Sequence, residues 1–413
     1  MPDAQPGDTE AVTLDLRSGR SIWELAAEEP SPARPLVRNV KTDVIIVGAG
    51  ITGSFLAERL TRAGREVVVL DRHEPQLAST AASTALLQWE IDAPMLELED
   101  RLGFDRASRI YRQSRETVRR IGALIGQDAA LCGFDWRQSL YLAGNALDAS
   151  DLREEHRLRG RAGIEGAYLT APEIMARYGF QRDAALLHQG SAETDPMALA
   201  KLLLDRAIAR GATVASPAHV IEYDCSALRV SVGTAAGIEV QGNALVLANG
   251  YEMPPIVAAR SHRLTSTWVV ATRPQPPEAL WQDRCLVWEA SQPYLYLRST
   301  TDNRIIVGGE DEATTDARER DARMPDKAAT LIGKLRDLLP QADGQVEAAW
   351  SGFFGATDDG LPLIGRVPGQ PRCFAAFGYG GNGITYSALA ADILDALMRG
   401  ESHEGEGEFA LDR

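Results

Sequence analysis

The stretch from Val44 to Pro75 limits the possible folds of this chain more than any other part of the sequence. A short apolar run, VIIV, is followed by glycines spaced G-x-G-x-x-G from Gly48, and then by a helical pattern. A second apolar run, VVVL, leads directly to an acidic residue, Asp71. Strand, glycine turn, helix, strand and acid in this order predict a β-α-β unit of the kind that binds a dinucleotide.

Each part of this unit has a physical reason. Glycines permit a tight turn between strand and helix, and they let the backbone approach a pyrophosphate closely. The free N–H groups and the partial positive charge at the start of a helix favour a phosphate there. Asp71, about 20 residues after the glycines, can accept hydrogen bonds from ribose hydroxyls.

Length and charge narrow the class of protein further. A chain of 413 residues is too long for one ordinary core and suggests two domains. Its net charge of −15 repels phosphate backbones, so nucleic acid is not an expected partner. No apolar stretch approaches the roughly 20 residues that cross a bilayer, and the first residues lack the pattern of a signal peptide. We expect no membrane span and a cytoplasmic location.

The cysteines and histidines indicate no metal site. Cys132, Cys225, Cys285 and Cys373 are scattered without C-x-x-C spacing, which favours buried, reduced thiols over a disulfide framework or a zinc site. The six histidines form no i, i+4 pair and no H-E-x-x-H pattern.

The first 39 residues differ in composition from the rest of the chain. They are polar and broken by three closely spaced prolines, which predicts an extended arm over the surface. The arm has one apolar cluster, Ile22, Trp23 and Leu25, which we expect to dock elsewhere on the protein.

A second α/β element and then an antiparallel sheet follow the first unit. Asp195 and Pro196 are typical of a helix start. The run ALVLANG, which ends at Gly250, has the pattern of a buried parallel strand that meets a ligand at its carboxyl end. From about His262 to Ile306 apolar and polar residues alternate, which predicts an antiparallel sheet with one covered face. This sheet would form a second domain that interrupts the first in the sequence.

Four features together resemble the FAD-dependent D-amino-acid oxidase superfamily, in the branch of glycine, sarcosine and gamma-glutamylputrescine oxidases. They are the glycine fingerprint with Asp71, the segment STAASTALLQ from Ser79, the segment ETDPMALAKLLLDRAIARGA leading to LVLANG, and the C-terminal DGLPLIG followed by FGYGGNGITYSALAADIL. The similarity runs from about Ser21 to Arg413. It implies an α/β fold with a Rossmann-type FAD-binding domain and an interleaved antiparallel-sheet substrate domain.

The resemblance also implies how the chain divides. We expect an N-terminal arm over residues 1–39 and an acidic tail over residues 401–413. The FAD-binding domain would comprise residues 40–140, 190–260 and 345–400, and the substrate domain residues 141–189 and 261–344.

The implied cofactor is FAD, held without a covalent bond, because no His or Cys lies in the STAAST segment. Small hydroxyl residues there can donate to pyrophosphate and flavin without blocking them. The helix after Asn382 would stabilise negative charge on reduced flavin. The residues expected to bind the cofactor are Gly48, Gly50, Ile51, Thr52, Gly53, Asp71, Arg72, Ser79, Thr80, Ser83, Thr84, Leu87, Val220, Ala248, Asn249, Gly250, Gly380, Gly381, Asn382, Gly383, Ile384 and Thr385.

The chain departs from the pattern by which amino-acid oxidases of this family hold a substrate carboxylate with arginine. Phe353 and Phe354 stand where glycine oxidase has one such arginine, and Gly381 stands at another usually basic position. Arg298 remains a candidate anchor, although a strand arginine is more often solvated or salt-bridged. We therefore expect an amine substrate, or an amino compound whose carboxylate lies far from the reacting carbon. The candidate pocket residues are Trp89, Trp268, Tyr294, Tyr296, Arg298, Phe354 and Tyr379, and no catalytic residue is assigned.

The implied reaction is oxidation of a C–N bond by hydride transfer to flavin N5, which gives an imine that hydrolyses in water. The electron acceptor stays open between oxygen and another acceptor, because Ile306 stands where sarcosine oxidases place an oxygen-activating lysine. Two other functions also stay open: FAD-dependent dehydrogenation of a hydroxy acid, and a non-catalytic flavoprotein subunit of a larger oxidoreductase.

Overall fold

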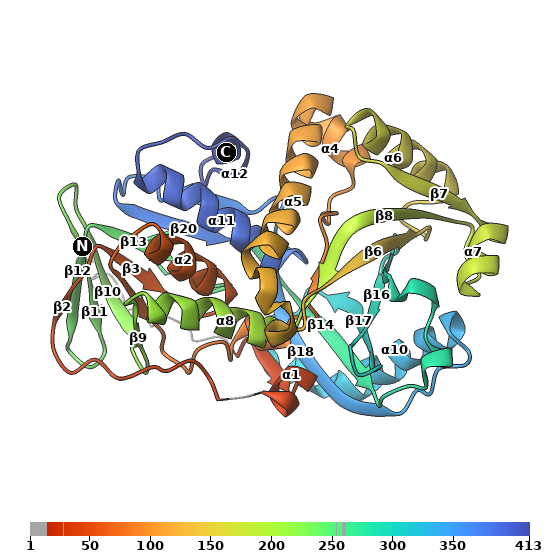
Figure 1. Ribbon diagram of the computed structural model, residues 1–413, viewed down its shortest axis with the longest axis horizontal. Coiled ribbons are helices and arrows are strands. Elements are labelled where there is room, and N and C mark those ends of the chain that lie inside the picture. Colours follow the sequence, from red (N-terminus) through yellow and green to blue (C-terminus); the bar gives the residue numbers. More distant parts are fainter. Residues whose placement is uncertain (1–14, 28, 253, 258–261) are drawn as a thin grey trace, which may run out of the picture.

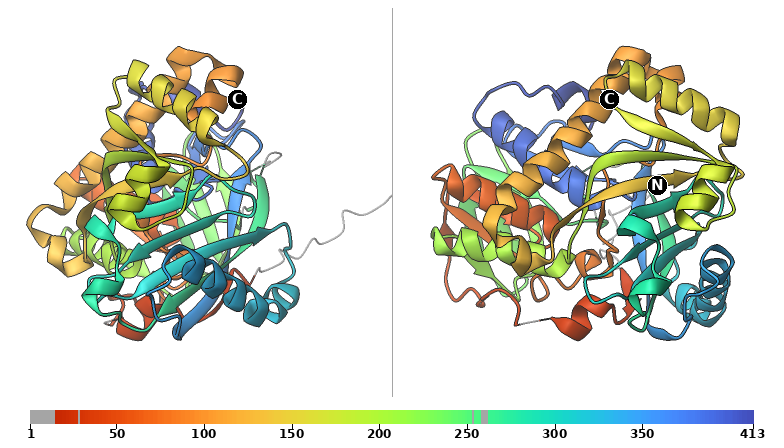
Figure 2. Two further views of the ribbon diagram at one scale, coloured as in Figure 1. Left: turned by 90° about the vertical axis from the view of Figure 1, so that its right-hand side faces the viewer. Right: turned by 45° about the vertical axis from the view of Figure 1, so that its right-hand side comes forward.

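The computed structural model describes residues 15–27, 29–252, 254–257 and 262–413, apart from the side chain of residue 262. These residues form three sheets with helices around them (Figures 1 and 2). In Figure 1 the long helix α5 (Phe104–Ile125) runs between two halves of the molecule.

A six-stranded sheet with the order β19-β20-β13-β3-β4-β9 forms the centre of one half. Its middle strands are β13 (Ala244–Leu247), β3 (Val44–Val47) and β4 (Val67–Leu70), which are parallel and buried. β20 (Cys373–Phe377) and β9 (Thr213–Ala215) extend the sheet in parallel, and β19 (Leu363–Arg366) pairs with β20 antiparallel.

Alternation along β3 explains the layers on the two faces of this sheet. Val44 and Ile46 belong to the core formed with the helices, whereas Ile45 and Val47 belong to the core on the opposite face. The helices are α2 (Ile51–Arg62), α8 (Pro196–Ala209) and α11 (Gly383–Met398), seen together in Figure 1. The opposite layer is a sheet of β10 (Val220–Cys225), β11 (Val230–Thr234), β12 (Glu239–Gly242) and β2 (Val40–Lys41).

The other half contains a ten-stranded sheet with the order β1-β18-β14-β17-β16-β15-β6-β8-β5, and β7 also pairs with β8. The strands are β1 (Arg17–Gly19), β18 (Val346–Thr357), β14 (His262–Thr272), β17 (Ile305–Glu312), β16 (Leu295–Ser299), β15 (Leu286–Glu289), β6 (Asp135–Leu142), β8 (Ala184–Glu193), β5 (Leu86–Leu87) and β7 (Gly166–Thr170). The run from β14 to β15 is antiparallel, as the alternating pattern predicts, but β15 pairs with β6 in parallel.

Strands β6 and β18 both lie in the ten-stranded sheet, although residues 135–140 and 346–357 fall within the segments expected to form the FAD-binding domain. Helix α10 (Met324–Leu338) packs on this sheet through Leu331 and Leu335, next to Trp268 and Val270 of β14. Further helices are α3 (Ser79–Ala82), α4 (Met95–Leu102), α6 (Ala149–Arg161), α7 (Ala171–Tyr178) and α9 (Ala317–Ala322). Among the described residues, no helix combines the length and apolar character needed to cross a bilayer.

The N-terminal arm is more ordered than a purely extended segment. β1 pairs with the edge strand β18, and helix α1 (Ile22–Ala26) follows it. Glu24 accepts a hydrogen bond of 3.0 Å from the Ser21 amide, which completes a capping box. Ile22 and Trp23 are buried against β14, β17 and β18, whereas Leu25 is half exposed. The cap and these two apolar residues explain why a helix forms here.

The last residues also fold back onto the protein. α12 (Glu406–Phe409) buries Phe409 against Tyr386 of α11, with ring centroids 6.0 Å apart. Arg413 forms an ion pair with Asp359 at 2.8 Å. The segment expected to be an acidic tail is therefore packed on the half that contains the parallel sheet.

Candidate functional site

The turn between β3 and α2 has no space for a side chain at two of its glycines. Gly48 has a φ of +110°, and a Cβ there would overlap the carbonyl oxygen of Ala248. A Cβ at Gly53 would overlap the carbonyl oxygen of Gly48. The backbone therefore passes very close to β13 as it enters α2, which leaves the start of that helix open to a ligand.

Asp71 follows β4 and contacts the same turn. Its carboxylate accepts hydrogen bonds from the amide of Ala49 at 2.6 Å and from the amide of His73 at 2.9 Å. Burial raises the pKa of Asp71, and the two amide hydrogen bonds oppose this rise. A hydrogen-bond acceptor is thus held at the carboxyl end of β4, beside the glycine turn.

A cavity of about 1100 Å³ lies beside the turn and reaches the ten-stranded sheet. This volume is slightly above the usual range for ligand pockets, roughly 300–1,000 Å³, and is large enough for a sizeable cofactor. The expected cofactor-binding residues that line it are Gly48, Gly50, Ile51, Thr52, Asp71, Arg72, Ser79, Thr80, Ser83, Thr84, Val220, Ala248, Asn249, Gly250, Gly380, Gly381, Asn382, Gly383 and Ile384.

Three expected cofactor residues lie outside the lining. Gly53 lies on the side of α2 that packs closely against the carbonyl group of Gly48. Leu87 is fully buried in the core beneath the helices. The hydroxyl of Thr385 donates to the carbonyl oxygen of Gln88 at 2.9 Å, so it holds the neighbouring segment instead of facing the cavity.

The loop Gly380–Gly383 places the start of α11 on the cavity. The Asn382 side chain donates to the carbonyl oxygen of Glu90 at 2.8 Å, and the Asp92 carboxylate accepts from the amide of Gly381 at 2.6 Å. These contacts tie the loop to the segment that follows the STAAST residues. Gly383 and Ile384 at the start of α11 line the cavity, and the free amides at the start of a helix favour negative charge nearby.

Unpartnered polar atoms in the lining indicate that the cavity is made for a polar ligand. The Ser79 hydroxyl and the Gln88 side-chain nitrogen are buried, and each lacks a hydrogen-bond partner in the described part of the chain. Together with the glycine turn, the Asp71 acceptor and the starts of α2 and α11, they fit a dinucleotide such as FAD.

Aromatic side chains line the part of the cavity formed by the ten-stranded sheet. Four of the candidate substrate residues, Tyr294, Tyr296, Phe354 and Tyr379, lie in the lining. Trp288 of β15 lines it as well, and the sequence analysis did not identify this residue. Its ring stacks on Tyr141 with centroids 3.7 Å apart, which holds it in place.

Trp89, Trp268 and Arg298 do not line the cavity. The indole N–H of Trp89 donates to the carbonyl oxygen of Gln189 at 2.9 Å, and that of Trp268 to the carbonyl oxygen of Arg320 at 3.1 Å. Both rings are fully buried core residues.

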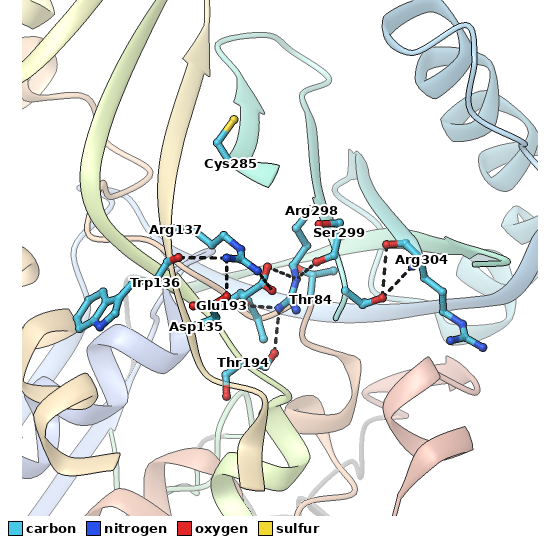
Figure 3. Close-up of polar contacts among 12 residues, drawn as sticks. Thr84, Asp135, Trp136, Arg137, Glu193, Thr194, Cys285, Arg298, Ser299 and Arg304 are labelled. Atoms are coloured by element: carbon cyan, nitrogen blue, oxygen red, sulfur yellow. Dashed lines mark hydrogen bonds and ion pairs between the residues drawn. The ribbon is translucent and has the colours of Figure 1, made fainter. Parts of the chain in front are cut away.

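Arg298 is not placed as a carboxylate anchor, because it is buried outside the lining and its Nη1 and Nε contact other parts of the protein (Figure 3). Its Nη1 donates to the carbonyl oxygens of Thr84 at 3.2 Å, Ala85 at 2.9 Å and Thr194 at 2.9 Å. Its Nε lies 3.5 Å from the carboxylate of Glu193. Arg298 is therefore a salt-bridged strand arginine, the alternative to a substrate anchor.

Two carboxylates near the aromatic rings were not identified from the sequence. Asp92 lines the cavity and is exposed to it, while surrounding protein raises its pKa by desolvation. Asp311 lies beside Thr267, another lining residue, and burial raises its pKa to about 7. The negative charge of Asp92 adds to that rise, and Lys327 and the Thr267 hydroxyl oppose it.

The basic residues of the lining lie elsewhere. Among the lining residues that the structure describes, they are Arg72 and His73, which follow β4, and His219, which precedes β10. Arg72 forms an ion pair with Glu252. The aromatic part of the lining thus carries negative and neutral side chains in the described residues.

Similarity to known proteins extends over most of the chain. A model of the DAO family, FAD dependent oxidoreductase, matches residues 43–397. The chain is 26% identical to gamma-glutamylputrescine oxidoreductase of Escherichia coli K12, over 92% of this chain and 89% of that protein. It is 23% identical to glycine oxidase of Bacillus licheniformis, over 87% and 93% of the two chains. The structure is similar to glycine oxidase from Geobacillus kaustophilus, with a TM-score of 0.75, 20% identity, and coverage of 91% of this chain and 99% of that one.

Proposed function

Because the chain belongs to the DAO family of FAD-dependent oxidoreductases, we propose that it oxidises a C–N bond of an amine that bears no carboxylate on its reacting carbon. The glycine turn at Gly48 would hold the pyrophosphate, Asp71 the ribose, and the start of α11 the flavin. Bound FAD supplies two-electron oxidation by taking hydride from the carbon next to nitrogen, which leaves an imine for water to hydrolyse.

The observation that carries this proposal is the charge of the aromatic part of the cavity. Asp92 lines this part and Asp311 lies behind the lining residue Thr267, whereas the lining cations of the described residues lie at the strand ends near β4 and β10. A carboxylate on the reacting carbon would meet like charge and no guanidinium among those residues. An ammonium group would instead be attracted by the carboxylates.

The side chains also suggest how such a substrate is held. Tyrosine rings such as Tyr294 and Tyr296 attract a cation through their π faces. Asp311, with its pKa raised to about 7, can take up a proton near neutral pH. Loss of a proton from the substrate ammonium frees the nitrogen lone pair that assists departure of hydride.

An anaerobic titration of the FAD-loaded protein tests the proposal. We expect primary or secondary amines to bleach the flavin absorbance faster than glycine, D-alanine or hydroxy acids at equal concentration. A preference for glycine or D-alanine would contradict the proposed substrate class. Bleaching by a hydroxy acid would support the alternative dehydrogenase, and a flavin that no small molecule bleaches would support the non-catalytic subunit.

The residue at position 306 bears on the choice of electron acceptor. Ile306 is fully buried in the apolar cluster with Ile22 and Trp23, and it does not line the cavity. We therefore favour an acceptor other than oxygen. Reoxidation of the reduced protein by an artificial quinone should be faster than reoxidation by air, and rapid reoxidation in air would favour an oxidase.

A further inference from the structure

Four successive backbone carbonyl groups, those of residues 82–85, are each bound by a side chain from a distant part of the chain. The indole N–H of Trp350 donates to the Ala82 oxygen at 2.9 Å, and that of Trp23 to the Ser83 oxygen at 2.7 Å. Arg298 donates to the Thr84 and Ala85 oxygens at 3.2 and 2.9 Å. The N-terminal arm, β16 and β18 thus all hold one short segment.

This segment is part of the cavity wall. Residues 82–85 all line the cavity, whereas Trp23, Arg298 and Trp350 do not. The carbonyl groups are therefore held on the side away from the cavity. Ala85 has a φ of +55°, which residues with a Cβ rarely adopt, so its conformation depends on such tertiary contacts.

The donors are themselves fixed. The Arg298 guanidinium lies 5.5 Å from the Trp23 ring centroid and 3.5 Å from the Glu193 carboxylate. Glu193 also binds Arg137 at 2.9 Å, and Figure 3 shows the two arginines on either side of it. Because Arg298 and Glu193 are almost fully buried, this network has little freedom to rearrange.

We propose that Trp23, Arg298 and Trp350 are positioning residues for the cofactor, which hold segment 82–85 in the shape that binds FAD. The N-terminal arm is then part of the cofactor site, although it does not belong to the glycine-fingerprint unit. A cofactor that contacts Ser83 and Thr84 gains from a wall already in its bound shape, since no ordering of the wall opposes binding.

A matched set of indole variants tests the proposal. W23F and W350F remove one N–H donor each and keep a buried ring. W281F is the control, because the Trp281 N–H also donates to a buried backbone carbonyl, that of Cys285 at 2.8 Å, but lies outside the cavity lining. The melting temperature of each apoprotein is measured, together with the dissociation constant for FAD from flavin fluorescence and the absorption spectrum of the bound flavin.

We expect all three variants to lower the apoprotein melting temperature by similar amounts. Only W23F and W350F should raise the dissociation constant for FAD, by about tenfold, and change the fine structure of the flavin absorption band. If both bind FAD as tightly as the wild type, or if W281F weakens binding equally, the positioning role is overturned. Failure of the wild type itself to bind FAD would instead overturn the cofactor assignment.

A second pair tests the arginine. R298K keeps the positive charge beside Glu193 but loses the planar group that reaches three carbonyl oxygens. R206K is the control, because Arg206 binds the carbonyl oxygens of Leu124 and Ile125 and lies outside the cavity lining. We expect R298K to weaken FAD binding more than tenfold and R206K to leave it unchanged, and equal FAD affinities in the two variants would contradict the role of Arg298.

Discussion

The Asp92 carboxylate accepts a hydrogen bond of 2.6 Å from the amide of Gly381, and this contact joins two walls of the cavity. Asp92 follows the STAAST segment, and Gly381 belongs to the loop that begins α11. A carboxylate at the start of a helix is stabilised by the free amides there. The same contact explains why the loop is made of glycine, because a Cβ at Gly380 would overlap the Asp92 carboxylate.

Substitution of Gly380 by alanine should therefore weaken cofactor binding. The residue has a φ of +57°, so alanine adds backbone strain of about 1 kcal/mol as well as the overlap with Asp92. We expect G380A to raise the dissociation constant for FAD by about tenfold or more, measured by flavin fluorescence. G369A is the control, because Gly369 also has a positive φ, +76°, but a Cβ there meets no atom within 4 Å and the residue lies outside the cavity lining. Equal effects of the two substitutions would show that the contact with Asp92 is unimportant.

Asp71 should contribute to the affinity for the adenosine half of the cofactor. Its carboxylate is held beside the glycine turn by the Ala49 and His73 amides, as a fixed acceptor for ribose. D71N should weaken FAD binding by about tenfold, because the neutral amide of asparagine accepts hydrogen bonds less strongly than a carboxylate does. FMN, which lacks the adenosine, serves as the control ligand in the same titration. An equal loss of affinity for FAD and FMN would argue that Asp71 acts on the fold of the turn and not on the ribose.

The two ion pairs that the buried Glu193 forms with Arg137 and Arg298 should matter for stability far more than a surface ion pair. E193Q removes a fully buried carboxylate and leaves the almost fully buried Arg298 guanidinium without a charged partner, so it should lower the free energy of unfolding by about 3 kcal/mol. E347Q breaks the half-exposed pair with Arg304 and should cost less than about 1 kcal/mol. Urea denaturation of the apoproteins measures both values, and similar losses would contradict the burial argument.

The glycine unit could be predicted from sequence because its signals are local. The apolar runs at Val44 and Val67 coincide with β3 and β4, and Asp195 accepts hydrogen bonds from the amides of Met197 and Ala198, as its expected place at a helix start requires. Each of these features depends on residues within a few positions of one another.

The aromatic part of the cavity could be predicted only in part. Alternation of residues shows which face of a strand a side chain lies on, but it does not show where along the strand the cavity ends. Tyr294, Tyr296 and Arg298 follow a two-residue period, yet only the tyrosines line the cavity, and Arg298 lies further along, against the carbonyl groups of residues 84 and 85. Asp311 had no local signal either. It lies within a register shift between β14 and β17, which changes the residues that share a face.

The raised pKa of Asp311, about 7, gives a pH dependence of stability with a definite sign. Between its ordinary pKa near 4 and its folded-state pKa, the native state binds more protons than the unfolded state, so the free energy of unfolding falls as pH rises through that window. D311N removes the titration. We therefore expect the variant to gain stability relative to the wild type from pH 4 to 7, by up to about 4 kcal/mol, whereas E347Q should show no such gain.

Ionisation of the same carboxyl should govern the attraction of a cationic substrate. As Asp311 loses its proton near pH 7, it joins Asp92 in attracting an ammonium group, so kcat/KM for an amine should rise through that pH in the wild type. In D311N this rise should be smaller by about tenfold, and the rise that remains belongs to the titration of the amine itself. Profiles of kcat/KM against pH for the wild type, D311N and E347Q measure the difference. If D311N keeps the wild-type profile, Asp311 does not act on the substrate and its charge matters for stability alone.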